Sequence, residues 1–161
     1  MGKGLNRSSD YPKNTTMVCV QTTLNVRFQR STDWDKLREM YLECDEICMG
    51  IPSDYVDVWL KCLADGISVV AELGDKIVGH AVVTPLNDRE VSLCVYVRKG
   101  YRSKGIGTRL VKFLIDKCRE MGFEKIRIVT EKNRAVEFFK RLGFRFVRAG
   151  YGYEMVLPLR T

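Results

Sequence analysis

A short glycine-rich turn is the part of this sequence whose residue types and spacing best suit chemistry. It reads Arg102-Ser103-Lys104-Gly105-Ile106-Gly107-Thr108 and lies between an alternating apolar run and a stretch of helical periodicity. The first N–H groups of a helix lack internal partners, and the aligned peptide dipoles add a partial positive charge there. Gly105 and Gly107 carry no side chain that would hold an anion away, while Arg102 and Lys104 add cations. The turn therefore predicts an anion site, best suited to a pyrophosphate.

Two other phosphate-binding loops do not fit the same residues. Gly100 and Gly105 have the glycine spacing of a P-loop, but Ile106-Gly107 stand where that loop needs Lys and Ser or Thr. A dinucleotide fingerprint beginning at Gly105 needs a third glycine, and Leu110 occupies that place. A plain tight turn would leave the pairing of two glycines with two cations unexplained. We therefore expect a phosphate site of another kind.

The elements that must position this turn follow from hydrophobic periodicity. Strands are predicted at residues 18–28, 67–73, 76–83, 90–97, 123–129, 144–147 and 153–157, and helices at 33–44, from Pro52 to about 66, at 106–121 and at 133–142. In the 90–97 strand, alternation places Val91, Leu93, Val95 and Val97 on one face. A helix separates this strand from the one at 123–129, so the two are expected to run parallel.

Length and composition indicate one globular domain. The chain has 161 residues, of which 45% are hydrophobic and 29% charged, which excludes disorder and fibrous repeats. No apolar run approaches the roughly 20 residues of a membrane helix, so no membrane partner is expected. Residues 1–16 are polar and lack the apolar stretch of a secretory signal. We expect them to form a flexible tail before a domain at 17–161, in a cytoplasmic protein.

The cysteines show neither metal-ligand spacing nor the pattern of a disulfide framework. There are six, at Cys19, Cys44, Cys48, Cys62, Cys94 and Cys118. Cys44 and Cys48 are one helical turn apart, but His80 is the only histidine that could join them. We expect reduced thiols and no metal.

The net charge of +7 is unevenly distributed along the chain. Residues 1–30 carry +4, residues 31–90 carry −8 and residues 91–161 carry +11. A basic half suits a polyanion such as nucleic acid or a phosphorylated cofactor, and an acidic half suits a cationic substrate. Both halves could equally be the solvated faces of ordinary helices.

Two segments together resemble a known family. Residues 102–107 resemble the Gln/Arg-x-x-Gly-x-Gly/Ala signature of the GNAT N-acyltransferases, and residues 135–144 resemble that family's Ala-x-x-x-Tyr-x-x-x-Gly-Phe helix and turn. The order of predicted elements from 18 to 157 matches as well. The resemblance implies an α/β fold of the α+β type, with a mixed sheet of six to seven strands flanked by about four helices. Two parallel strands would splay apart to form the cofactor cleft.

The resemblance also implies acetyl-CoA as co-substrate, with its pantetheine arm paired to the main chain of residues 95–97 beside a β-bulge near Tyr96. A bulge leaves ladder groups unpaired, and an N–H there would stabilise the tetrahedral oxyanion. The cofactor-binding residues expected are Val95, Tyr96, Val97, Arg102, Ser103, Lys104, Gly105, Ile106, Gly107, Thr108, Asn133 and Phe139.

The chemistry implied is direct attack of a neutral amine on the thioester. A lysine-like amine, with a pKa near ~10.4, needs a base or a water relay at neutral pH. Glu90 and Tyr96 are the candidate catalytic residues. Phe139 stands where the family usually has the tyrosine that protonates the CoA thiolate, and Asn133 is one place closer to its helix than usual. Water or Tyr151 could supply the proton, the thiolate could leave unassisted, or the domain could bind CoA without turnover.

The acceptor is expected to be a primary amine, on a small molecule or a protein. The acidic block at residues 33–57 falls on the two early helices, which border the acceptor side in this family, so it suggests a cationic acceptor. Arg127 stands where the ribosomal-protein N-terminal acetyltransferases carry a catalytic glutamate, so that subgroup is not adopted. An acyl-CoA-binding regulatory module and a tRNA-directed acetyltransferase are the alternatives. Other nucleic-acid binding is not expected, and a homodimer is expected because dimers are common among the proteins it resembles.

Overall fold

The computed structural model describes residues 23–43, 55–150 and 152–159, and seven strands in these ranges form one sheet. The strands are β1 (Leu24–Phe28), β2 (Ile67–Leu73), β3 (Lys76–Pro85), β4 (Glu90–Val97), β5 (Lys125–Thr130), β6 (Arg145–Ala149) and β7 (Tyr153–Pro158). The helices are α2 (Trp34–Leu42), preceded by the 3-10 turn η3 (Ser31–Asp33), α3 (Val56–Leu63), α4 (Ile106–Glu120) and α5 (Asn133–Arg141). The sheet order is β1-β2-β3-β4-β5-β7-β6. The expected mixed sheet with four helices is confirmed.

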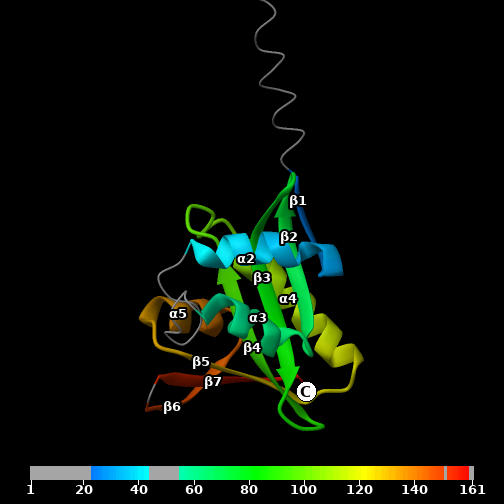
Figure 1. Cartoon of the computed structure of the whole chain (residues 1–161). Coiled ribbons are helices and arrows are strands. Elements are labelled where there is room, and N and C mark those ends of the chain that lie inside the picture. The colour runs from blue at the N-terminus through cyan, green and yellow to red at the C-terminus, as the bar shows by residue number, and fades with distance from the viewer. Residues whose placement is uncertain (1–22, 44–54, 151, 160–161) are drawn as a thin grey trace, which may run out of the picture.

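The helices cover the sheet on both faces. Figure 1 shows α2 and α3 across one face and α4 across the other. Leu110 and Leu114 of α4 are fully buried, and a Cβ added to Gly79 of β3 would lie 2.8 Å from Cδ1 of Leu110. Because that contact leaves no room for a methyl group, α4 rests directly on the backbone of β3. On the other face, Leu37 and Met40 of α2 belong to a second buried cluster.

Element ends differ from the predicted ones by a few residues, and the later start of one strand has a local cause. The strand predicted to start at Phe123 starts at Lys125. Gly122 has a φ of +87°, and the Phe123 N–H donates to the Cys118 carbonyl at 3.1 Å. This is the hydrogen bond of a Schellman cap, so Phe123 belongs to the end of α4. Residues 1–16 and 18–22, Pro52 and Tyr151 lie outside the described residues.

The two parallel strands part after a short contact. β4 and β5 pair only at Glu90↔Lys125, Val91↔Ile126 and Ser92↔Arg127, although both strands continue further. The expected splay is therefore confirmed. All other neighbouring strands in the described sheet are antiparallel.

The prediction of a β-bulge near Tyr96 is wrong. The β3 and β4 ladder runs without a register shift from Pro85↔Val91 to Gly79↔Val97. The register shift found in this part of the sheet lies instead between β2 and β3, beside Ala71 and Glu72. The open edge of β4 arises because β5 turns away, which requires no extra residue in β4.

The two cysteines whose side chains the structure describes, Cys94 and Cys118, form no disulfide. Burial raises the pKa of the Cys118 thiol to about 11. Cys19, Cys44 and Cys48 lie outside the described residues. Within the described ranges, no three potential ligands are grouped to hold a metal ion, and no helix is long and apolar enough to cross a membrane.

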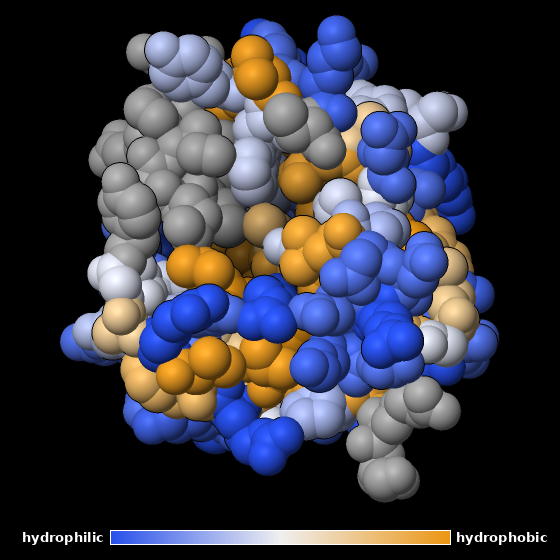
Figure 2. All heavy atoms as spheres, turned by 90° about the horizontal axis from the view of Figure 1, so that it is seen from below, coloured by the Kyte–Doolittle hydropathy of each residue, from blue (hydrophilic) through white to orange (hydrophobic). Residues whose placement is uncertain are grey.

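The end of the molecule that carries β6 and β7 has a mixed surface. Viewed from below, hydrophobic patches alternate with strongly hydrophilic ones (Figure 2). β6 is the last strand of the sheet order, and its Phe146 and Val147 are 50% and 47% exposed. An edge strand with exposed apolar side chains is a surface on which another chain can pair.

Candidate functional site

A cleft of about 780 Å³ lies where β4 and β5 diverge. Its walls come from β4, the turn before α4, the first residues of α4, the end of β5 and α5. Nine of the predicted cofactor residues line it: Val95, Tyr96, Val97, Arg102, Ser103, Gly105, Gly107, Thr108 and Phe139. Sequence segments about 40 residues apart therefore meet around one hollow.

The main chain of β4 presents polar groups to this cleft. The Arg98 N–H donates to the Val78 carbonyl at 2.8 Å, which fixes the phase of the antiparallel ladder. By alternation, the N–H and C=O groups of Val95 and Val97 point away from β3 towards the gap. Arg102 Nε donates to the Val97 carbonyl at 2.8 Å from that side. An extended ligand with amide groups could satisfy the remaining edge groups.

The helix that follows the turn opens at the same cleft. Gly105 is the N-cap of α4, with a φ of +85°, and no side chain accepts from the first turn of the helix. The first helical hydrogen bond runs from the Arg109 N–H to the Gly105 carbonyl at 3.1 Å. The N–H groups of Ile106, Gly107 and Thr108 thus have no helical acceptor, and this favours an anion.

The two glycines of the turn serve different purposes. Gly105 needs its positive φ, and a Cβ placed there would meet nothing within 4 Å. At Gly107, a Cβ would lie 3.2 Å from Cζ of Phe138. Gly107 therefore permits the close approach of α5 to α4, in addition to lining the cleft.

Three predicted cofactor residues are not among those that line the cleft. The side chain of Ile106 is 5% exposed and packs in the core against Gly79, so only its main chain is placed for an anion. Lys104 and Asn133 are exposed, and neither is among the residues that line the cleft.

Glu90, a predicted base, lies at the closed end of the splay and does not line the cleft. Its Oε1 accepts from Arg127 Nη2 at 2.7 Å and from Nε at 3.1 Å. These hydrogen bonds hold the pKa of Glu90 below its ordinary value. Arg127 also pairs with Glu154, which in turn accepts from Arg148 at 2.8 Å. A carboxylate so engaged is a weak base.

Tyr96, the other predicted catalytic residue, does line the cleft. Its ring centroid is 5.1 Å from that of Tyr41 on α2, and the Arg102 guanidinium lies 5.4 Å from the ring. Both contacts restrict the ring. Tyr96 therefore connects the α2 face of the sheet to the turn before α4.

Phe139 lines the cleft as an apolar group. It is 5% exposed, and its ring packs edge-on against Phe138 and Phe144 at centroid distances of 5.0 and 5.1 Å. No proton donor stands at this position.

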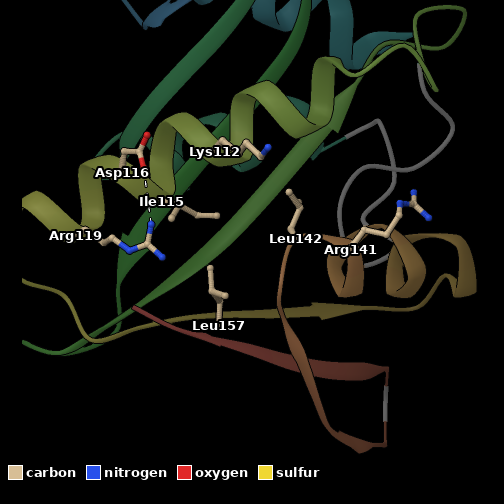
Figure 3. Close-up of a pocket in the computed structure, with 7 residues that line it drawn as sticks. All are labelled: Lys112, Ile115, Asp116, Arg119, Arg141, Leu142 and Leu157. Carbon is tan, nitrogen blue, oxygen red and sulfur yellow. Dashed lines mark ion pairs between the residues drawn. The ribbon is translucent and has the colours of Figure 1, made fainter. Parts of the chain in front are cut away.

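Sequence reasoning missed the basic residues on the α5 side of the cleft, which are Lys132, Arg134 and Arg141. The two that flank Asn133 could have been noticed, because cations at the start of a helix oppose its dipole and imply an anionic partner. Arg141 also borders a second hollow of about 320 Å³. Figure 3 shows Ile115, Leu142 and Leu157 directed into it and the Asp116–Arg119 ion pair at its side.

Three carboxylates of the acidic block expected to attract a cationic acceptor are paired with arginines, and Asp45, Glu46 and Asp54 lie outside the described residues. The three pairs are Asp33 with Arg27 at 2.8 Å, Glu43 with Arg98 at 2.8 Å and Asp57 with Arg38 at 2.7 Å. Hydrogen bonds from these arginines lower the pKa of Asp33 and of Glu43. The three carboxylates therefore serve the fold first.

The sheet order, the splayed parallel strands and the helix N-terminus at the open strand define the acyltransferase class of fold. The model of the acetyltransferase (GNAT) family matches residues 34–144, which is more than half of the chain. The chain belongs to this family.

Individual relatives agree with this assignment. Probable N-acetyltransferase camello of Xenopus tropicalis is 32% identical over 81 residues, which are 47% of this chain and 37% of that protein. The chain thus spans well under two thirds of this relative. A GNAT acetyltransferase from Staphylococcus aureus Mu50 superposes with a TM-score of 0.71 at 21% identity, over 86% of this chain and 100% of the other. A phosphinothricin acetyltransferase from Sinorhizobium meliloti, solved in complex with AcCoA, gives 0.70 at 20% identity, over 84% and 88%. At such identities the structures share the fold.

Proposed function

We propose that this protein transfers an acetyl group from acetyl-CoA to a primary amine by direct attack. The observation that carries the proposal is one cleft that joins an open strand edge to an uncapped helix N-terminus. These two features suit the two ends of acetyl-CoA, an amide-bearing arm and a diphosphate.

The residues that would hold the cofactor follow from this match. The first-turn N–H groups of α4, with Arg102, would bind the diphosphate. The edge groups of Val95 and Val97 would pair with the pantetheine amides. Lys132 and Arg134, across the cleft, add positive charge. The cofactor supplies the acetyl group as a thioester.

The protein must then assist three steps: removing a proton from the ammonium, stabilising the oxyanion and releasing the thiolate. Edge N–H groups of β4 are suited to the oxyanion, and one such donor can contribute ~3 kcal/mol. Since Glu90 is tied to Arg127, Tyr96 or a water relay is the better candidate for the first step. A thiol with a pKa near ~8.5 leaves tolerably well, so Phe139 does not preclude turnover.

A cationic acceptor is proposed from the charge of −8 over residues 31–90. The arginine pairs of Asp33, Glu43 and Asp57 reduce what each of these can contribute. A cytoplasmic location is part of the same proposal, because acetyl-CoA is made and used inside cells.

The test is calorimetry with acetyl-CoA, followed by thiol release against a panel of amines. Gly105→Glu would place a carboxylate at the anion site and should abolish cofactor binding. Gly122→Glu is the matched control, because Gly122 has nearly the same φ, +87°, at the far end of α4. It should cost similar stability and leave binding intact. Loss of binding in both variants, or in neither, would refute the assignment of this turn as the diphosphate site.

Two other outcomes identify the alternatives. Stoichiometric binding without transfer to any amine would indicate an acyl-CoA-binding regulatory module. Transfer to RNA, with an affinity that falls steeply with salt, would indicate a tRNA-directed enzyme.

A further inference from the structure

His80 on β3 is the least exposed polar side chain in the described part of the chain, at 1%. It lies on the α2 face and takes part in two hydrogen bonds. Tyr41 Oη is 2.7 Å from Nδ1, and Ser68 Oγ is 2.6 Å from Nε2. The Ser68 hydroxyl also donates to Gln29 Oε1. Side chains from α2, β2, β3 and the residue after β1 thus form one hydrogen-bonded network, the His80 network (Gln29, Tyr41, Ser68 and His80).

The donor and acceptor roles within the His80 network follow from counting protons. Ser68 has one hydroxyl proton and donates it to Gln29, so its oxygen must accept from His80. With Gln29 Oε1 facing Ser68, this assigns His80 the Nε2–H tautomer, whose Nδ1 accepts from the Tyr41 hydroxyl. Burial lowers the pKa of His80 to about 4, which agrees with a neutral ring.

The His80 network is connected to the cleft by aromatic contacts. The Tyr41 ring meets the imidazole edge-on, at 5.7 Å and 79°, and lies against Tyr96 at 5.1 Å and 36°. Tyr96 lines the cleft, on the face of β4 opposite to Val95 and Val97. Since α4 and α5 fill that opposite face, an amine must approach the thioester from the side of Tyr96.

We propose that His80 is a positioning residue, which fixes the Tyr41 hydroxyl and thereby holds Tyr96 as the wall that orients the incoming amine. The role rests on the proposed acetyl transfer. It requires no contact between His80 and substrate, and no proton moves through the His80 network. A rotated Tyr41 would remove a contact that restricts the Tyr96 ring.

The first experiment tests the His80 network by NMR and needs no measurement of enzymatic activity. Because His80 is the only histidine, ¹⁵N-histidine labelling gives one imidazole, whose two nitrogens report the tautomer by NMR. We expect Nε2–H and no titration between pH 8 and 5. An Nδ1–H tautomer, or titration near 6.5, would overturn the proposal. Tyr41→Phe should shift the Nδ1 resonance and leave Nε2 little changed.

The second experiment separates positioning from structure. Tyr41→Phe keeps the ring on Tyr96 but removes the hydroxyl that donates to His80. It should raise KM for the amine by about tenfold, the effect of one lost hydrogen bond. The Kd for acetyl-CoA should change less than about twofold, since the β4 edge and the α4 N-terminus are untouched. His80→Asn retains an acceptor near Nδ1 and should be less impaired than His80→Val.

A core variant that lowers stability comparably, Ile115→Val, should leave this KM unchanged. A parallel rise in the Kd for acetyl-CoA, or an unchanged KM in Tyr41→Phe, would refute the positioning role alone. If the wild-type protein transfers acetyl to no amine, the proposed function fails and the positioning role with it, whatever the NMR spectrum shows.

Discussion

Arg127 on β5 donates two hydrogen bonds to Glu90 on β4, at 2.7 and 3.1 Å, across the last residue pairs that still join the two strands. The pair lies at the closed end of the splay, where it links the strands just before they part. It therefore stabilises the geometry of the cleft, and we expect that Glu90 does not act as the general base.

Glu90→Gln should accordingly leave kcat within about threefold of wild type, whereas loss of a general base costs 10²-fold or more. Thermal stability should fall. The pKa of Glu90 is lowered in the folded state, so its stabilising effect is present at neutral pH and is lost as the pH falls through that lowered value. The measurements are a kcat–pH profile and thermal melts at pH 7 and 3.5.

Glu154→Gln is the control, because Glu154 is the other carboxylate paired with Arg127. Both variants should lose comparable stability and keep their turnover. A 100-fold fall in kcat confined to Glu90→Gln would reinstate Glu90 as the base.

Phe139→Tyr should increase kcat, by up to about 100-fold if the new hydroxyl protonates the thiolate, which is the lower end of what a positioned acid contributes. Phe139 lines the cleft and is otherwise buried, so the hydroxyl has only the cleft to enter. Single-turnover rates with acetyl-CoA give the chemical step directly.

Phe144→Tyr places the same hydroxyl on the neighbouring buried ring, which does not line the cleft. It should cost stability without a gain in rate. Equal rates in wild type and Phe139→Tyr would show that thiolate release needs no acid at this position.

The residues that the sequence predicts correctly are those whose signal is local. Alternation in Glu90–Val97 gives the strand to the residue, and the change of period at Gly105 gives the helix start. The hydrogen bond from Phe123 to Cys118 was missed because a cap depends on the φ of Gly122 rather than on hydrophobicity.

The contacts that govern the site are not local. Glu90 and Arg127 are 37 residues apart, and Tyr41 and His80 are 39 apart, so each pair depends on sheet register and helix placement. The bulge expected near Tyr96 rested on the family resemblance and not on any residue of this chain. The edge of β4 is open because β5 diverges from it, and no bulge is needed.

The exposed edge of β6 predicts how the chain would form the expected homodimer. Phe146→Glu should convert a dimer to a monomer, because it places a charge among apolar side chains on the edge strand. Val58→Glu, at a 59% exposed site on α3, is the control and should not change the mass. Light scattering after gel filtration measures both. A monomeric wild type, or an equal effect of the two variants, would exclude a β6 interface.

The single histidine gives the stability of this protein a defined pH dependence. The ordinary pKa of histidine is ~6.5, and burial lowers that of His80 to about 4 in the folded state. The unfolded chain therefore binds a proton between these values and the folded chain does not, so stability rises with pH across this window. Between pH 7 and 5 the free energy of unfolding should fall by about 2 kcal/mol from this group alone. The carboxylates with lowered pKa values lose their stabilising effect as the pH falls towards and below their ordinary pKa values of 3.8 to 4.5, so most of the change between pH 7 and 5 is expected from His80. Urea denaturation at the two pH values measures the difference, and His80→Asn should abolish most of it. An unchanged difference in His80→Asn would mean that His80 is not buried as a neutral ring.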